Sequence, residues 1–190
     1  MKNNKLLRGF SLIEVLMVIA IIAVLSGAGA WIMVYTVKNS VFIPNQLNMD
    51  KLANDALNIM ITGDKQASGL RFSRSITAIA ANQVNFINQD GAAIIYRLDT
   101  GTNKLYRKID AAAEINLPFY ANIGNIAISG PTASPTTIFT YYDSAEISTA
   151  VAADVRRIQI ILVAKSGTGS YNDWEGSSEQ ITSIAVDKLQ

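Results

Sequence analysis

A single carboxylate, Glu14, stands in the apolar amino-terminal part of the chain. It is the only charged residue between Phe10 and Val37. A carboxylate among apolar residues in a membrane costs roughly 2.5–3.5 kcal/mol on insertion scales, so such a group usually has a partner and a function. The chemistry expected of Glu14 is therefore charge pairing in a low-dielectric layer. The alternative is a stray polar residue near the membrane surface, neutral through protonation.

A glycine and an aromatic residue, Gly9 and Phe10, precede this carboxylate. Glu14 is one helical turn after Phe10.

The sequence has few other residues that could act as nucleophiles, bases or metal ligands. Cysteine and histidine are absent from all 190 residues, which excludes disulfides, zinc–thiolate sites, thiol nucleophiles and a histidine base. The loop over residues 171–176 places Asp173 and Glu175 near an amide oxygen, a weak candidate for a hard-cation site. Its ligand number is low and the EF-hand spacing is missing, so a solvated polar loop explains it more simply.

The sequence therefore predicts a protein that is not an enzyme and that has no cofactor. The net charge of +1 gives no strongly basic footprint for nucleic acid. The largest basic group near the carboxyl end, Arg156-Arg157 with Lys165, is too small to indicate a DNA-binding surface.

The element that positions Glu14 is a long helix expected over residues 10–63, after a leader of residues 1–9. The uncharged run from Val15 to Val37 would be roughly 35 Å long as a helix, enough to span a bilayer. We expect residues 10–37 to cross the membrane. The leader side of the span carries three positive residues, Lys2, Lys5 and Arg8, whereas Lys38 is the single positive residue just beyond the span. This asymmetry predicts a cytoplasmic amino terminus and an exported remainder. A signal peptide cleaved after Ala28-Gly29-Ala30, or a plain signal anchor, is the alternative.

Two features modify this helix. Gly27 and Gly29 each cost roughly 1 kcal/mol relative to alanine in a helix interior, which indicates either close packing through small residues or a segment that loses helicity on assembly. Pro44 is expected to bend the helix or to break it after Ile43. Beyond it, residues 45–63 are predicted to form an amphipathic stretch whose apolar residues share one face: Met49, Leu52, Ala56, Ile59, Met60 and Gly63.

The remainder of the chain, residues 70–190, is expected to form an exported head rich in β-strands. Val84 and Phe86 alternate with polar residues, and Asp90-Gly91 gives a hairpin turn. Strands are predicted around 94–98, 105–109, 123–129, 137–143, 155–165 and 181–186, with irregular stretches at 130–136, 146–154 and 166–180. The fold class is α+β, with the amphipathic part of the helix packed on an antiparallel sheet.

The run Arg8-Gly9-Phe10-Ser11-Leu12-Ile13-Glu14-Val15-Leu16 resembles the class III signal of type IV pilins and type II secretion pseudopilins. The resemblance implies that prepilin peptidase cleaves between Gly9 and Phe10 and N-methylates Phe10. Gly9 has no side chain, so its backbone can lie in the narrow cleft of such a protease. The implied cut would create an α-amine at Phe10, and an unpaired cation is costly in an apolar layer. The resemblance implies that Glu14 occupies the family's acidic position in assembly, where we expect it to neutralise the amine of a neighbouring subunit and so set the axial register of packed helices. A Glu14→Gln form that polymerised normally would contradict this role. The resemblance also implies that residues around Gly27 and Gly29 give the helix flexibility. The implied partners are other pilin subunits, the membrane lipid and an inner-membrane assembly platform driven by a separate ATPase.

The head resembles the J-type minor pseudopilins and related minor pilins. The resemblance rests on Val84-Asn85-Phe86, on Ile94–Asp99 followed by Leu105-Tyr106-Arg107, and on Phe139–Asp143 before a long apolar strand. It implies a tip or initiation subunit of a type IV pilus or pseudopilus, in the inner membrane and then in the filament. The absence of cysteine excludes the disulfide-closed kind of major pilin.

Two alternatives remain beside a minor subunit. The chain could be a major subunit of the same kind of filament, or a signal-anchored exported binding protein or enzyme with a similar start. The residues carry no signal that distinguishes secretion from motility, adhesion or DNA uptake.

Overall fold

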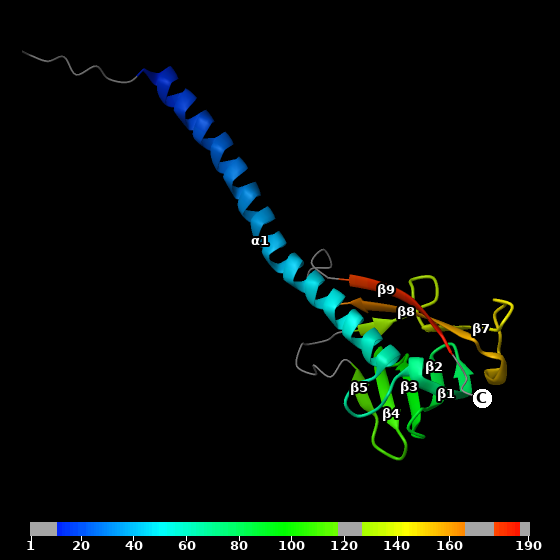
Figure 1. Ribbon diagram of the computed structural model, residues 1–190. Helices are drawn as coiled ribbons and strands as arrows, with labels where there is room; N and C mark the ends of the chain where they lie inside the picture. The colour runs from blue at the N-terminus through cyan, green and yellow to red at the C-terminus, as the bar shows by residue number, and fades with distance from the viewer. Residues whose placement is uncertain (1–10, 118–126, 166–176, 187–190) are drawn as a thin grey trace, which may run out of the picture. The chain divides into compact units, whose positions relative to one another are not determined.

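The computed structural model describes residues 11–117, 127–165 and 177–186. The chain divides into two compact units, Met1–Val41 and Phe42–Gln190. Helix α1 (Leu12–Thr62) contributes to both units, and all the strands belong to the second. The predicted α+β class, with one long amino-terminal apolar helix followed by antiparallel sheets, is confirmed (Figure 1).

The first sheet contains five strands in the order β1-β2-β3-β4-β5, all antiparallel. Its first strand follows a short 3₁₀ helix, η1 (Leu70–Phe72). The tight turn at Gly91, where φ is +86°, joins β2 to β3, as the Asp90-Gly91 pair predicted. The bounds are β1 Ser73–Ala80, β2 Gln83–Asn88, β3 Ala93–Asp99, β4 Lys104–Ile109 and β5 Ile115–Leu117.

The second sheet is built around its longest strands, β8 and β9. Strands β6 and β7 both pair with one edge of β8, and β9 pairs with the other edge along its full length. A second 3₁₀ helix, η2 (Ala152–Asp154), precedes β8. The bounds are β6 Ala127–Ser129, β7 Phe139–Tyr142, β8 Arg157–Lys165 and β9 Ser177–Ala185.

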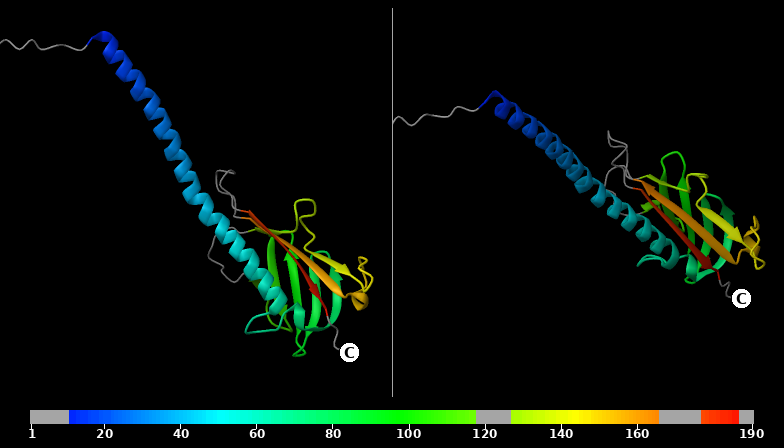
Figure 2. Two further views of the ribbon diagram at one scale, coloured as in Figure 1. Left: turned by 45° about the horizontal axis from the view of Figure 1, so that its top comes forward. Right: turned by 90° about the horizontal axis from the view of Figure 1, so that it is seen from above.

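One hydrophobic core joins the two sheets and the last turns of α1. The buried residues Ala56, Leu57 and Met60 of α1 lie in the same cluster as Phe86 of the first sheet and Ile160 of the second. Figure 2 shows these last turns alongside the strands in both views. The strand predicted around residues 155–165 is confirmed as β8, in which Ile158, Ile160 and Leu162 are fully buried. Burial of such side chains, at roughly 1.5–3 kcal/mol each, is the main stabilising contribution to the head.

Of the two outcomes predicted at Pro44, a bend or a break, the break is wrong, because α1 continues through that residue to Thr62. A proline inside a helix costs about 3 kcal/mol through its missing N–H and its steric clash. Proline does not exclude a continuing helix, because a helix can kink at proline and lose one hydrogen bond. The apolar face predicted beyond it is correct, since Met49, Leu52 and Met60 are buried, and Ala53 and Leu57 widen this face.

The helix ends where a left-handed residue stops it. Gly63 has φ +88°, and its N–H donates to the carbonyl of Ile59 at 2.9 Å. A Cβ at Gly63 would lie 2.2 Å from the carbonyl oxygen of Ala67, so the position needs glycine for both its conformation and its space. The turn folds back so that Gly63 pairs with Ser68.

A buried arginine, Arg107 of β4, anchors this turn to the first sheet. Its Nη1 lies 3.0 Å from Asp64 Oδ1, and its Nη2 donates to Gln66 Oε1 at 2.7 Å. Tyr96 of β3 donates from its hydroxyl to the carbonyl of Ile59, at 3.1 Å. The end of α1 is therefore held by polar contacts as well as by apolar packing.

Several predicted boundaries differ from the structure. The strands lie in two sheets, whereas the alternation predicted one, because a strand pattern does not say which strands pair. Strands β1 and β5 were not predicted. The irregular stretch predicted over residues 166–180 is wrong in its last four residues, since β9 begins at Ser177. Ser177, Ser178, Glu179 and Gln180 have low strand propensity, and their pairing with β8 overrides it.

Candidate functional site

The first turn of α1 is closed by a reciprocal pair of hydrogen bonds between Ser11 and Glu14. Ser11 Oγ accepts from the Glu14 N–H at 3.3 Å, and Glu14 Oε2 accepts from the Ser11 N–H at 2.9 Å. The Ser11 hydroxyl also donates to Glu14 Oε2 at 3.1 Å. This is a capping box, in which serine at the N-cap and glutamate at the third helical position satisfy two backbone donors.

The capping box assigns Glu14 a second task that the sequence analysis missed. Ser11, three residues before a glutamate at the start of an apolar run, is the sequence signal that could have revealed it. In a single chain the carboxylate is held at the amino-terminal end of its own helix, where the helix dipole also favours negative charge. Any partner that binds Glu14 must therefore share or displace these contacts.

The part of α1 that follows has no apolar core of its own. Its large apolar side chains are exposed, with fractions from 45% at Val15 to 80% at Leu12. Within the described residues, α1 is the one helix long and apolar enough to cross a membrane, judged by length and composition, and none of its most apolar window is buried. Exposed apolar area of this size requires lipid or other helices around it.

Aromatic residues and the first polar contacts come near the end of this apolar run. Trp31 and Tyr35 stack with their ring centroids 5.8 Å apart, as residues four apart on a helix can. Thr36 Oγ1 donates to the carbonyl of Ile32 at 2.9 Å, so its hydroxyl is satisfied within the helix. Tryptophan and tyrosine are typical of the membrane–water interface, and Lys38 follows them.

The two glycines of the apolar run lie within continuous helix. A Cβ added to Gly27 or to Gly29 would meet nothing within 4 Å in this chain. Alanine at either position would therefore fit the isolated helix, and no contact inside the chain explains the choice of glycine. The two interpretations, close packing against another helix and a loss of helicity on assembly, both place the reason outside the single chain.

Other residues that the sequence analysis singled out lie outside the described part of the chain. Gly9 and Phe10 precede it, and the weak cation candidates Asp173 and Glu175 fall in the gap between β8 and β9. Among the residues that the structure does describe, no group of three or more histidine, cysteine, aspartate or glutamate side chains could hold a metal ion.

Comparison with known proteins gives one match. Residues 5–30 match the family model of the prokaryotic N-terminal methylation motif. Neither a curated protein nor a solved structure matches the chain. The matched segment contains Gly9, Phe10, Ser11 and Glu14 and runs through Gly29.

The matched motif supports a type IV pilin-like prepilin, that is, a subunit of a pilus or pseudopilus. Such a motif implies processing by prepilin peptidase and assembly with other pilins. The single amino-terminal apolar helix fits a membrane-anchored pilin, and the helix with its antiparallel sheets has the pilin-like architecture expected of such a subunit.

Proposed function

We propose that this chain is a minor subunit, of the tip or initiation type, of a type IV pilus or type II secretion pseudopilus. The methylation motif over residues 5–30, at the start of an exposed apolar helix, is the observation that supports a pilus or pseudopilus subunit. The minor type rests on the resemblance of the head to minor subunits and on the absence of cysteine. The function is structural: the subunit acts by assembly and not by turnover of a substrate.

The proposed sequence of events starts in the inner membrane. Prepilin peptidase cleaves between Gly9 and Phe10 on the cytoplasmic side, and the same enzyme methylates the new amine of Phe10. The apolar part of α1 holds the subunit in the bilayer, with the head exported. The assembly platform then extracts the subunit, and apolar helices of neighbouring subunits replace lipid around α1.

Glu14 has a specific role in this proposal. Before assembly its carboxylate is satisfied by Ser11 in its own helix. On docking, we propose that the amine of Phe10 from a neighbouring subunit pairs with this carboxylate. An ammonium–carboxylate contact in a low-dielectric layer is strong only at short range and in good geometry. It would therefore fix one axial register among helices whose apolar contacts alone allow several.

The proposal is tested by mass spectrometry of the amino terminus of the chain isolated from cells with active prepilin peptidase. The expected terminal residue is Phe10 carrying one methyl group. The same preparation from cells without the peptidase should begin with the leader. An uncleaved terminus in the presence of the enzyme would contradict the proposal and favour a signal-anchored exported protein.

The abundance of this chain in filaments distinguishes a minor from a major subunit. Sheared filaments should contain this chain at a small fraction of the main subunit, and its deletion should reduce the number of filaments. If the chain made up most of the filament mass, it would be a major subunit.

A further inference from the structure

The longest unpaired sheet edge among the described residues belongs to β9. Strand β9 pairs with β8 in regular register from Ser177 to Ala185, and no described strand pairs with its other edge. The other outer strands are less suited to pairing. Strands β5, β6 and β7 have only three or four residues, and β1 contains register irregularities and lies beside η2. Short strands, bulges and covering segments are the usual ways of blocking an edge. Strand β9 is long and regular; Gln46 of α1 covers its first residue, Ser177, and η1 lies beside it, so the open part of the edge runs from Glu179 to Ala185.

The direction of the free backbone groups follows from one side chain. The amide of Gln46 in α1 pairs with Ser177 as a neighbouring strand would: Gln46 Nε2 donates to the Ser177 carbonyl at 2.6 Å, and the Ser177 N–H donates to Gln46 Oε1 at 3.1 Å. Backbone groups alternate along a strand, so those of Glu179, Ile181, Ser183 and Ala185 lie on the same edge as Ser177. Within the described parts of the chain nothing hydrogen-bonds these groups.

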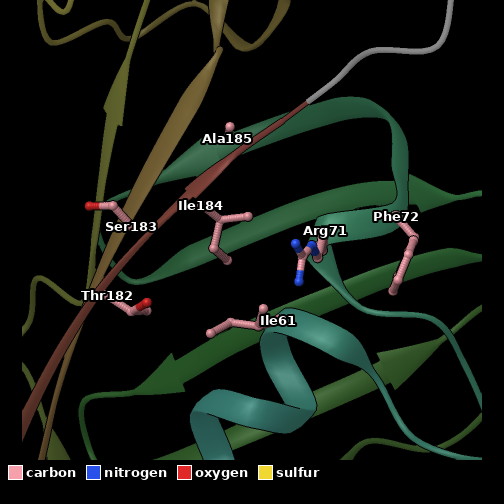
Figure 3. A pocket seen from close by; sticks show the side chains of 7 residues that line it. All are labelled: Ile61, Arg71, Phe72, Thr182, Ser183, Ile184 and Ala185. Atoms are coloured by element: carbon pink, nitrogen blue, oxygen red, sulfur yellow. The ribbon is translucent and has the colours of Figure 1, made fainter.

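A pocket of about 450 Å³ lies beside the carboxyl-terminal half of this edge. Figure 3 shows Thr182 and Ile184 directed toward Ile61 and Arg71, while Ser183 is directed to the opposite side of β9. The remaining lining residues are Phe72 and Ala185. The pocket therefore faces the side of β9 on which the even-numbered side chains lie.

Two residues of η1 give this pocket its chemical character. Arg71 is exposed and forms no ion pair within the described residues, unlike Arg97, Arg107 and Arg157. Phe72 is 42% exposed, although Leu70 and Ser73 nearby in the chain are buried. An exposed cation that forms no ion pair within the described residues, next to an exposed aromatic ring, is suited to an acidic side chain followed by an apolar one.

We propose that the free edge of β9 is a docking site for an extended, acidic segment of a different protein chain. The segment adds as a further strand to the second sheet, using the outward N–H and C=O groups from Glu179 to Ala185. Its alternate side chains enter the pocket, where a carboxylate binds Arg71 and an apolar residue contacts Phe72. The proposal goes beyond the role of the chain in a filament and depends only on the head.

A second copy of this chain is a poorer occupant of the same edge. In an antiparallel pair of two β9 strands, residues opposite each other share a face, so the pocket side would receive the even-numbered residues of the copy. These are Ser178, Gln180, Thr182 and Ile184, none of them acidic. The only carboxylate of the strand, Glu179, would lie on the other face, so the β9 strand of the copy would offer Arg71 no counter-ion.

The first experiment asks whether the edge is open in the isolated chain. Amide hydrogen exchange is measured on the full-length protein in detergent micelles. The N–H groups of Ile181 and Ser183 should exchange fast, and those of Gln180 and Thr182, which face β8, should exchange slowly. Slow exchange at all four would mean that the chain covers its own edge, and it would overturn the proposal.

The second experiment identifies the occupant in producing cells. Phe72 is replaced by the photo-crosslinking residue p-benzoylphenylalanine in the full-length protein, and adducts are mapped by mass spectrometry. The expected adduct joins this position to a segment of another protein that has an aspartate or glutamate within a few residues. The same photo-residue at Ile147, an exposed position outside the pocket lining, shows whether adduct formation is specific.

Paired variants decide whether backbone pairing and charge cause the adduct. Ser183→Pro removes an outward N–H without removing a bond to β8, and it should lower the adduct yield about tenfold or more, whereas Ser183→Ala should keep it. Both variants lose the contact from Arg157 Nη1 to Ser183 Oγ, so they are matched. Arg71→Glu should likewise lower the yield and Arg71→Lys retain most of it, which keeps the test valid if the proline variant misfolds. No adduct, an adduct only with a second copy, or a yield that none of these variants changes would overturn the proposal.

Discussion

At the scale of single residues, substitutions of Ser11 and Glu14 distinguish two properties of the first turn of α1, the helix cap and the negative charge of the carboxylate. Glutamine at the third helical position can also accept from the Ser11 N–H, so Glu14→Gln keeps the capping geometry and removes only the negative charge. Ser11→Ala does the opposite, because it removes the hydroxyl and leaves the carboxylate in place. The two substitutions therefore report on different properties of one turn.

We predict that Glu14→Gln reduces incorporation into filaments by about tenfold or more, whereas Ser11→Ala has a small effect. The reason is that a neighbouring amine needs a counter-charge, while loss of a helix cap costs only about 1 kcal/mol and acts on one chain. Incorporation is measured by immunoblotting of sheared filaments against membrane-bound protein. The opposite order, with Ser11→Ala the more harmful, would show that helix capping and not charge pairing is the contribution of Glu14.

At the scale of elements, α1 is where the sequence was most informative. The exposed apolar run and the buried face from Met49 to Met60 were both predictable, because a period of 3.6 residues over many turns is a strong signal. The continuation through Pro44 was not predictable from the residue type, since proline can either end a helix or only kink it. The two-sheet arrangement was also hidden, because β8 pairs with strands that lie before and after it in the chain. In the candidate site, the capping role of Ser11 was predictable from its spacing to Glu14. The burial of Arg107 at the end of α1 was not predictable, because its position in a strand pattern does not reveal its contact with Asp64.

We predict that the double substitution Gly27→Ala, Gly29→Ala strengthens the helix and weakens assembly. Each alanine should stabilise the helix by roughly 1 kcal/mol, and in the isolated chain neither Cβ meets another atom. Helix content of the chain in micelles, measured by circular dichroism, should therefore stay equal or rise, while incorporation into filaments falls. Unchanged incorporation would mean that neither small size nor flexibility is needed at these positions.

We also predict that Trp31 lies at the outer interface of the bilayer and not near its centre. If the span starts close to Leu12, Trp31 is roughly 28 Å along the helix, near the far side of a hydrocarbon core of about 30 Å. In a Trp174→Phe background Trp31 is the only tryptophan, so quenching by lipids brominated at defined depths can locate it. Strongest quenching from bromines near the bilayer centre would contradict the assigned span.

At the scale of the whole molecule, the folding stability of the head depends on the contacts that fix the end of α1 to the sheets. Burial alone raises the pKa of Asp64, but hydrogen bonds from Arg107 and from the backbone N–H groups of Gln66 and Ala67 hold that pKa below its ordinary value. The carboxylate form is thus favoured by folding. A lowered pKa in the folded state stabilises the protein above the unfolded value of 3.8, and this stabilisation is lost as the pH falls through the folded pKa.

We therefore predict that Asp64→Ala destabilises the head by roughly 3 kcal/mol at neutral pH, because it leaves the buried charge of Arg107 without its carboxylate. The loss should shrink below about pH 4, where protonation weakens the same contact in the unmodified chain. Glu114→Gln is the matched control, since the Arg97–Glu114 pair has a similar distance of 2.7 Å but is more exposed and should contribute less than about 1 kcal/mol. Thermal unfolding followed by near-ultraviolet circular dichroism at pH 7 and at pH 3 measures both. Equal effects of the two substitutions at pH 7 would show that the buried arginine does not fix the end of α1 to the sheet.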